Sequence, residues 1–576
     1  MKFLLVAVNA KYIHSNPAIY SLRAYAGKEL QSHIELAEYT INNYAQDILA
    51  DIYRRKPDVV GFSCYIWNFG LVKELLSDIS KVLPNTEIWL GGPEVSFDGP
   101  EALKAYPMIK GIMAGEGEET FKELLEFYTG RTDKKLSEIE GLILREGKTG
   151  ERKFLTMDDI PFLYDSLDEF TNKIIYYESS RGCPFRCSYC LSSIDKTVRI
   201  RSLDKVKEEL SFFLERKVPQ VKFIDRTFNC NHAHALEIWN YIKEHDNGVT
   251  NFHFEIAADI MTQEEIDLLK SLRPGLVQLE IGVQSTYEKT LREINRFVNT
   301  SHIEKVVQQL KENENIHIHL DLIAGLPYED YDRFVTSFDE VYGWGPEQLQ
   351  LGFLKVLKGS LMEEKREAYW ISYQQNPPYE VLSTNWLSYE DVLRLKQVEE
   401  MVEVYYNSNQ FRHILAVLIE EFDSAFAMFE ALADYHERKG YFVKAPARSS
   451  RYEILLAFAC EKRSDREELY RELLTYDFYL REKAKSRPSY APSQESYRDE
   501  IWEFYCKEEE NPVYLKSYES YHARQTMKMT HLEVFSYPVW EKAVKKAVVR
   551  REKPAFVLFD YQQRNPLTGD AKTFVI

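Results

Sequence analysis

Residues 1–150 repeat one hydrophobic rhythm, in which a short apolar run ends in a small or polar loop and a helix-patterned stretch follows. The apolar runs predict strands at Phe3–Val8, Ile34–Tyr39, Val59–Ser63, Glu87–Leu90 and Gly111–Met113. The stretches between them predict helices at Ala18–Leu30, Ala45–Arg55, Val72–Val82 and Glu118–Tyr128. This alternation predicts a doubly wound, Rossmann-like parallel sheet, with ligands outside the carboxyl ends of its strands.

The same rhythm returns from Ile174 to about Lys358 with longer helices. Its apolar runs predict strands at Ile174–Glu178, Val221–Asp225, Phe252–Ile256, Leu276–Ile281, Ile316–Ile323 and Gln348–Val356. Six βα units of this kind place their chemistry at the carboxyl ends of the strands. Residues 151–172, between the two βα regions, are acidic and punctuated by proline, which predicts a linker.

Beyond residue 376 the pattern changes to long stretches with apolar residues three and four positions apart, which predict helices. These stretches are Asp391–Tyr406, His413–Lys439 and Arg451–Lys485. A hairpin is expected from Pro554–Tyr561 and Lys572–Ile576, and the basic run Lys542–Lys553 is expected as a solvated helix face or, alternatively, a contact for an anionic partner. We therefore expect domains at 1–150 and 173–375, a linker at 151–172, and a mostly α domain at 376–576.

Composition narrows the class of protein. The net charge of −18 argues against a protein that holds nucleic acid over a wide surface. The apolar start of the chain is too short for a membrane helix or a secretory signal, and no later stretch reaches about 18 apolar residues. Seven cysteines are too few, and odd in number, for a disulfide scaffold. We expect a cytoplasmic protein with no membrane partner.

The candidate chemistry is concentrated in residues 180–191, where Cys183, Cys187 and Cys190 follow one another at intervals of four and three. A [4Fe–4S] cluster normally takes four cysteines, so three leave one iron open to another ligand. Gly182 allows close approach of the backbone, and Tyr189 precedes the last cysteine. Structural zinc is the alternative, but no fourth Cys or His follows within the next twenty residues.

This Cys-x3-Cys-x-aromatic-Cys loop resembles that of the radical S-adenosylmethionine (SAM) superfamily position for position. The resemblance implies that the open iron binds SAM and that one electron then gives a 5′-deoxyadenosyl radical. It also implies a partial (β/α)6 barrel for residues 173–375, and a reductant such as flavodoxin or ferredoxin as partner. Cys230 is given no ligand role, because a fourth cysteine would block the site that SAM needs.

In related enzymes SAM lies across the strand ends, which makes the polar and small residues there candidates for binding it. Glu255 is a candidate to accept hydrogen bonds from ribose hydroxyls, with a solvated carboxylate as the alternative. Gln284 and Ser285 are candidates to hold the ribose or the carboxylate, and Gly325 to admit the adenine. The candidate SAM-binding residues are Tyr189, Asp225, Glu255, Gly282, Gln284, Ser285 and Gly325.

The N-terminal loops differ from a dinucleotide site, because Gly-x-Gly-x-x-Gly is missing after the first strand. The loops 65–68, 91–94 and 114–118 resemble the cobalamin-binding domain of the B12-dependent radical SAM enzymes. The candidate cobalamin-binding residues are Asn9, Ser63, Tyr65, Trp67, Asn68, Gly91, Gly92, Pro93, Glu94, Gly115, Glu116 and Gly117. His14 lacks the Asp-x-His-x-x-Gly context of a cobalt ligand, so the resemblance implies base-off binding.

Tyr65 and Trp67 are candidates to cover the lower face of the corrin, with ordinary aromatic packing as the alternative. A domain that has lost its cofactor is a further alternative. If both cofactors are present, the carboxyl edges of the sheet and the barrel must face each other, so that reacting atoms come close. Part of residues 376–576 is expected to close the cavity between them.

The family resemblance implies a cobalamin-dependent radical SAM methyltransferase, in which methylcobalamin supplies the methyl group and the deoxyadenosyl radical removes hydrogen from an unactivated carbon. A rearrangement, cyclisation or redox enzyme, with cobalamin as electron mediator or lost, is the alternative within this class. A non-catalytic cobalamin or cluster sensor is the alternative outside it. The substrate stays open among a small molecule, a peptide, a nucleoside in RNA and a lipid.

Overall fold

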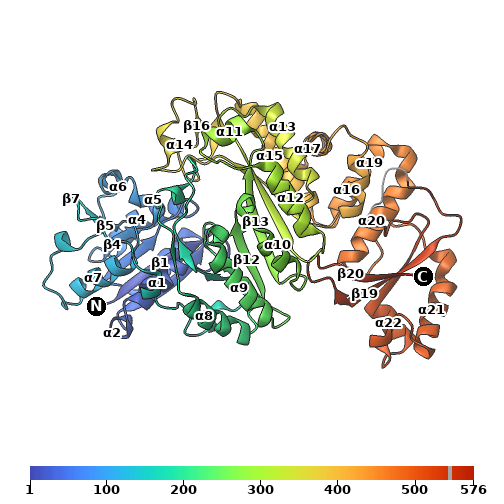
Figure 1. Cartoon of the computed structure of the whole chain (residues 1–576), viewed down its shortest axis with the longest axis horizontal. Helices are drawn as coiled ribbons and strands as arrows, with labels where there is room; N and C mark the ends of the chain where they lie inside the picture. Colours follow the sequence, from blue (N-terminus) through green and yellow to red (C-terminus); the bar gives the residue numbers. More distant parts are fainter. Residues whose placement is uncertain (542–547) are drawn as a thin grey trace. The chain divides into compact units, whose positions relative to one another are not determined.

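The computed structural model describes residues 1–541 and 548–576 (Figure 1). The first half of the basic run expected at 542–553 therefore lies outside the described residues. The chain divides into two compact units. The first unit comprises Met1–Ile316, Ile323–Asp330 and Gly352–Tyr389, and the second comprises His317–Leu322, Tyr331–Leu351 and Glu390–Ile576. Within the described ranges, no helix is both long enough and apolar enough to cross a membrane.

The N-terminal sheet has the strand order β2-β1-β3-β4-β5-β6-β7. Its strands are β1 (Phe3–Asn9), β2 (Ile34–Thr40), β3 (Val59–Ser63), β4 (Glu87–Gly91), β5 (Ile109–Met113), β6 (Leu142–Leu144) and β7 (Gly147–Lys148). The first five are parallel, as expected from the sequence. The short antiparallel strands β6 and β7 were not expected, because two or three residues carry too little periodicity to be recognised.

Helices cover both faces of this sheet, because alternate residues of β1 are buried on opposite sides. Phe3 packs edge-on against Phe121 of α7, with ring centroids 5.0 Å apart. Leu4 and Val6 belong to the core on the other face, with residues of α3 and α4. The helices are α1 (Pro17–Tyr25), α2 (Lys28–Gln31), α3 (Ala45–Arg55), α4 (Phe69–Val82), α5 (Pro93–Ser96), α6 (Gly99–Ala105) and α7 (Glu118–Tyr128).

The second α/β region forms all six expected strands, which confirms the predicted partial barrel. They are β8 (Ile175–Tyr177), β11 (Gln220–Phe223), β12 (Asn251–Ile256), β13 (Val277–Gln284), β14 (His317–Ala324) and β15 (Gln348–Phe353). Within the first unit, β13, β12, β11 and β8 are neighbours in that order and run parallel. The helices between the strands are α8 (Leu203–Glu215), α9 (His232–Glu244), α10 (Gln263–Lys270), α11 (Glu288–Glu293), α12 (Thr300–Lys311) and α13 (Tyr331–Gly343).

A segment of the first unit that the sequence did not single out follows β15, and we call residues 354–383 the arm. It contains α14 (Leu361–Glu364), β16 (Ser372–Tyr373) and β17 (Val381–Ser383). Leu354, Val356, Met362 and Val381 of the arm share a buried apolar cluster with Leu326, which follows β14. The arm is therefore packed onto the carboxyl end of the barrel strands.

The second unit is mostly helical after residue 390, as expected. Its helices are α15 (Tyr389–Met401), α16 (Arg412–Ile419), α17 (Ala425–Lys439), α18 (Tyr441–Lys444), α19 (Ser450–Lys462), α20 (Glu467–Arg481), α21 (Arg498–Glu510) and α22 (Ala523–Met529). β19 (Ala555–Arg564) and β20 (Ala571–Val575) form the expected hairpin, and β18 (Thr530–Phe535), which was not expected, pairs with β19. The expected helix His413–Lys439 is split at Ser424, whose side chain caps α17.

Candidate active site

The cysteine loop lies between two short antiparallel strands, β9 (Ser180–Arg181) and β10 (Arg199–Ile200). Gly182 has a φ of 91°, and a Cβ there would lie 2.2 Å from the carbonyl oxygen of Thr197, so only glycine fits. The backbone N–H of Cys183 donates to the carbonyl of Asp195 at 3.2 Å. This turn presents the three cysteines from one short segment.

The three thiols lie close enough to influence one another. Cys183 and Cys187 are buried, and Cys190 is half-buried. Burial raises the pKa of the Cys183 thiol, and the charges of Cys190 and Cys187 raise it further. The hydroxyl of Thr227 lies 3.6 Å from Cys183 Sγ. A cationic cluster iron offsets this mutual repulsion of thiolates, so the donor set fits a metal centre.

Arg296, which the sequence analysis did not identify, brings a positive charge to the cysteine loop. Its Nη1 donates to Cys187 Sγ at 3.8 Å, and its Nη2 donates to the carbonyl of Gly282. It follows α11, where Asn295 takes a left-handed conformation with a φ of 57°. In the sequence, the only local sign of this role for Arg296 is that it follows an asparagine, a residue that tolerates a left-handed turn, just after a βα unit.

The candidate SAM-binding residues of β13 and the loop after it lie beside Arg296. A Cβ at Gly282 would lie 2.2 Å from Gln284 Nε2, so the missing side chain makes room for that of Gln284. Gln284 Oε1 is buried and has no hydrogen-bond partner in the described part of the chain. The same holds for Oδ1 of Asp259, which lies within electrostatic reach of Arg296. Unpaired buried oxygens next to a thiol cluster fit a polar ligand such as SAM.

Other candidates from the strand ends have partners within the protein. Ser285 is buried and donates to Glu329 Oε1 at 2.7 Å. Gly325 has a φ of 91°, and a Cβ there would lie 2.9 Å from Val381 Cγ1, so this glycine admits the arm. Burial raises the pKa of the half-buried Tyr189 well above its usual range. Ser285 and Gly325 thus have neighbours in the loop after β14 and in the arm, and Tyr189 belongs to the cysteine loop itself.

Asp225 and Glu255, two of the candidate SAM-binding residues, have partners within the barrel. Asp225 is buried and accepts hydrogen bonds from Ser179 N at 3.0 Å, Ser179 Oγ at 2.6 Å and Ser180 Oγ at 2.5 Å. Burial raises its pKa to about 6. Glu255 Oε1 lies 3.9 Å from the ammonium nitrogen of Lys222. Asp225 thus ties the end of β11 to the strand that leads into the cysteine loop.

The loop after β3 of the N-terminal sheet is held by Asn68, which is buried. Its amide nitrogen donates to the carbonyls of Val8 at 3.0 Å and Ser63 at 2.9 Å, and its oxygen accepts from Tyr65 N at 2.8 Å. The Tyr65 and Trp67 rings stack with centroids 4.3 Å apart. Trp67 is 45% exposed, so the stacked pair offers an apolar plate at the strand edge.

The neighbouring glycine loop, residues 91–94, approaches this loop closely. Gly91 ends β4, and Gly92 has a φ of 106° with a Cβ position only 2.5 Å from the carbonyl oxygen of Cys64, so no side chain fits there. Pro93 begins α5, and the carboxylate of Glu94 is buried. A smooth backbone surface of this kind suits a broad flat ligand, as the corrin of cobalamin is.

Of the remaining residues at the N-terminal edge, His14 contacts a strand of the barrel. Asn9 is buried and donates to the carbonyl of His14 at 3.1 Å, and His14 Nδ1 lies 2.5 Å from the hydroxyl of Tyr176 in β8. Gly115 has a φ of 79° with open space around its Cβ position, whereas a Cβ at Gly117 would lie 3.1 Å from a methyl of Leu22.

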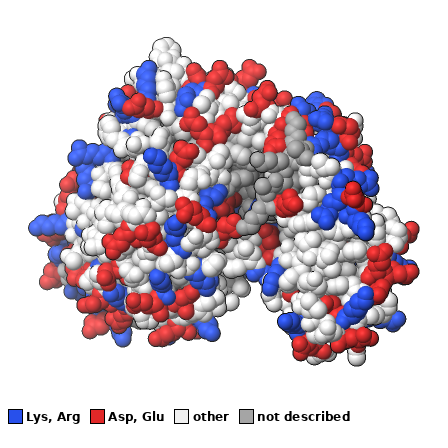
Figure 2. All heavy atoms as spheres, turned by 45° about the vertical axis from the view of Figure 1, so that its right-hand side comes forward, with Lys and Arg blue, Asp and Glu red and all other residues white. Residues whose placement is uncertain are grey.

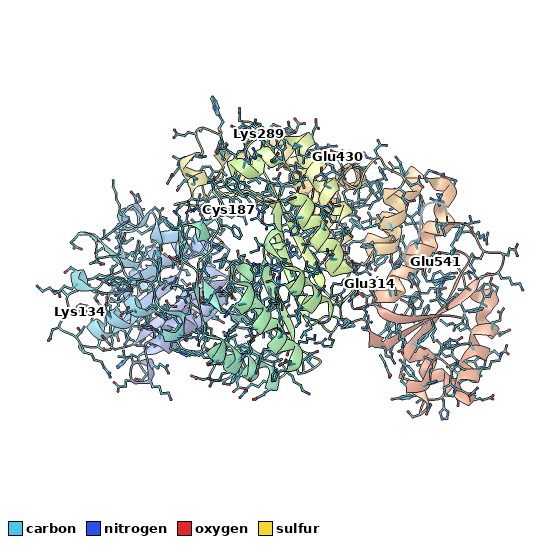
Figure 3. All side chains as sticks on the ribbon, viewed as in Figure 1. Lys134, Cys187, Lys289, Glu314, Glu430 and Glu541 are labelled. Carbon is cyan, nitrogen blue, oxygen red and sulfur yellow. The ribbon has the colours of Figure 1, made fainter. Side chains whose placement is uncertain are left out.

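Ion pairs join this edge to the cysteine loop. Glu118 Oε1 accepts from Arg181 Nη2 at 2.6 Å, and Glu116 Oε1 accepts from Arg199 Nη2 at 2.6 Å. Arg181 is two residues before Cys183, and Figure 3 shows Cys187 where the N-terminal sheet region meets the barrel strands. The loop after β5 of the N-terminal sheet is therefore held against the cysteine loop in the first unit.

Three domain families match the chain: the B12 binding domain over residues 4–125, the Radical SAM superfamily over 177–341, and a Protein of unknown function (DUF4080) over 367–559. The chain thus contains a B12 binding domain followed by a radical SAM domain. The matches confirm the expected cofactors: cobalamin for the B12 binding domain, and a [4Fe–4S] cluster with SAM for the radical SAM domain.

Individual relatives are distant. The chain is 25% identical over 427 residues to the cobalamin-dependent radical SAM methyltransferase TokK of Streptomyces tokunonensis. The aligned region covers 66% of this chain and 61% of TokK. The chain is 27% identical over 300 residues to the uncharacterized methyltransferase PH0819 of Pyrococcus horikoshii, over 49% of this chain and 63% of the relative. The chain thus spans about three fifths of the length of these relatives.

The fold also matches solved structures. The radical SAM enzyme OxsB, with aqua-cobalamin and SAM bound, superposes with a TM-score of 0.54 at 15% identity, over 87% of this chain and 75% of OxsB. At this identity the likeness concerns the fold alone.

Proposed function

We propose that this protein is a cobalamin-dependent radical SAM methyltransferase that methylates an unactivated carbon. One observation carries the proposal: the ion pairs of Glu116 and Glu118 with Arg199 and Arg181 hold the glycine-bearing edge of the B12 binding domain against the cysteine loop. A methyl group carried at one site can reach a carbon activated at the other only if the two sites adjoin. The methyltransferase names of TokK and PH0819 support this choice of reaction.

The chain's own residues have separable tasks in this proposal. Cys183, Cys187 and Cys190 would hold the cluster, and Gln284 with Asp259 would give hydrogen-bond acceptors to SAM. When bound, the cluster with SAM supplies a hydrogen-abstracting radical and cobalamin supplies the methyl group. Arg296 stabilises negative charge on the Cys187 sulfur, because its guanidinium is fixed by the Gly282 carbonyl.

The N-terminal residues would orient the corrin rather than ligate the metal. The Tyr65–Trp67 plate covers apolar surface and excludes water, while Gly92 keeps the backbone close to the loop after β3. His14 is engaged with Tyr176, which supports the expectation of base-off binding. Glu116 and Glu118 position the edge through their arginine partners.

An external electron donor belongs to the proposal, since the chain must receive one electron for each radical formed. We propose a small reductant such as flavodoxin or ferredoxin, in the cytoplasm, where seven free thiols are compatible with the redox conditions. Figure 2 shows acidic and basic side chains interspersed over the visible face, without a continuous basic surface for nucleic acid.

Isotope transfer tests the proposed reaction. Anaerobically reconstituted protein is incubated with reductant, cobalamin and SAM carrying a trideuterated methyl group, together with the small-molecule and peptide fractions of a cell extract. We expect 5′-deoxyadenosine and a product that carries three deuterium atoms, found by mass spectrometry only when cobalamin is present. Formation of 5′-deoxyadenosine with no deuterated product in any fraction, or with equal turnover in the absence of cobalamin, would contradict methyl transfer.

A further inference from the structure

The arm contacts both cofactor loops. Met362 N donates to the carbonyl of Ser188, between the second and third cysteines, at 2.8 Å. Lys358 Nζ lies 3.1 Å from Glu94 Oε1, at the glycine loop of the B12 binding domain, and the hydroxyl of Tyr379 donates to the same oxygen. The arm therefore spans the junction at which the two cofactor sites adjoin.

A cavity of about 350 Å³ opens in the arm between these contacts. It is lined by Val356, Lys358, Glu363, Tyr373, Gln375 and Tyr379. Glu363 directly follows Met362, which contacts the cysteine loop, and Lys358 and Tyr379 are the two residues that contact Glu94. A volume of this size holds a small organic molecule or a group of a larger one.

The charges around the cavity favour a cationic ligand. The ammonium of Lys358 already has two carboxylate partners, Glu94 Oε1 at 3.1 Å and Asp98 Oδ2 at 2.7 Å. Glu363 accepts a hydrogen bond from Gly359 N at 2.7 Å, but among the described residues no lysine, arginine or histidine forms an ion pair with it. The lining contains one lysine and one glutamate, but the lysine is already neutralised by Glu94 and Asp98, so Glu363 is the charge that a ligand can compensate.

We infer that this cavity binds a primary ammonium group of the substrate, with Glu363 as the counter-ion; the inference rests on the proposed methyltransferase function. The ring of Tyr373 suits an ammonium, because cations are attracted to aromatic faces; the ring of Tyr379 already has the ammonium of Lys358 5.3 Å from its centroid. The carboxamide oxygen of Gln375 offers a further acceptor. The substrate class is therefore amines, and a hydrocarbon without such a group is rejected, because it would bury the charged wall unpaired.

Binding of a simple diamine tests this inference without knowledge of the substrate. The probe is 1,4-diaminobutane, and its uncharged match is 1,4-butanediol, each titrated calorimetrically into the reconstituted full-length protein. We expect the diamine to bind at least about tenfold more tightly than the diol. The variant Glu363→Gln should weaken diamine binding by about tenfold or more, and Gln375→Glu should tighten it.

The neighbouring Glu364 is exposed and does not line the cavity, so Glu364→Gln is the matched control and should bind the diamine as the wild type does. The diamine should also change the electron paramagnetic resonance spectrum of the reduced cluster, because Met362 contacts the cysteine loop. Equal binding of diamine and diol, or equal losses in the Glu363 and Glu364 variants, would overturn the inference. The inference would also be overturned if neither the wild type nor the Gln375→Glu variant bound the diamine.

SAM cleavage and cobalamin retention, measured on the same preparations, separate this inference from the proposed function. Diamine binding without either cofactor activity would refute the methyltransferase and leave the amine site standing. SAM cleavage and cobalamin retention without diamine binding would refute the amine site and leave the proposed methyltransferase function standing.

Discussion

Two buried sites, one in each compact unit, differ in how their polar oxygens are hydrogen-bonded. In the second unit, buried carboxylates accept hydrogen bonds from backbone amides: Glu472 from Ser536 and Tyr537, and Asp477 from His413 and Ile414. In the first unit, Gln284 Oε1 and Asp259 Oδ1 are buried beside the cysteine loop without a partner in the described residues. Because an unpaired buried oxygen is costly, paired groups indicate structural roles and unpaired ones indicate ligand sites.

The largest expected effect comes from the thiols. Replacing Cys187 by Ala should abolish cluster binding and SAM cleavage, because the two remaining cysteines cannot hold a cluster of four irons. Cys230→Ala is the matched control, since Cys230 is near Cys183 but has no ligand role, and its cleavage activity should stay close to that of the wild type. Iron content and 5′-deoxyadenosine formation check both variants. Cleavage by Cys187→Ala, or its loss in Cys230→Ala, would contradict the assignment of the cluster ligands.

The next effect concerns the paired carboxylate Glu472. Burial raises its pKa to about 7, above the 4.5 of an exposed glutamate, so the native state holds the proton more tightly than the unfolded chain does. The stabilisation from this group is full below pH of about 4.5 and is lost as the pH rises to about 7. Glu472→Gln cannot ionise, so its free energy of unfolding should rise relative to wild type by about 3 kcal/mol between pH 4.5 and pH 8.

Urea unfolding of both proteins at the two pH values measures this difference. A difference between variant and wild type that does not change with pH would show that Glu472 is ionised in the native state throughout this range.

The smallest effect concerns the unpaired oxygen of Gln284. Gln284→Leu removes an unsatisfied group of similar size, so the free energy of unfolding should change by less than about 1 kcal/mol. The same substitution should weaken SAM binding by about tenfold, because a hydrogen-bond acceptor for SAM is lost. Urea unfolding and equilibrium dialysis with SAM separate the two quantities. A large loss of stability with unchanged SAM affinity would assign Gln284 to the structure instead.

Local patterns explain how much of this architecture the sequence could predict. Strands β1 and β3 each consist almost wholly of an apolar run, and the three cysteines lie within eight consecutive residues, so a short window contains the whole signal. Arg296 contacts Cys187 across 109 positions of the chain, and no local pattern encodes such a pairing. The arm was missed for the same reason, because its contacts with Ser188 and Glu94 exist only in the folded protein.

The ion pairs that join the two cofactor domains limit how freely these domains can be exchanged between related proteins. Glu118 is buried and its partner Arg181 is largely so, which means that substitution of Arg181 alone leaves the Glu118 carboxylate without its ion pair in a poorly hydrated place, whereas Arg181 itself keeps Glu178 as a second partner. The B12 binding domain and the cysteine loop are therefore not interchangeable parts. A B12 binding domain transplanted from a relative with neutral residues at positions 116 and 118 would leave Arg181 with Glu178, and Arg199 with Asp195, but would remove the ion pairs that join the two domains.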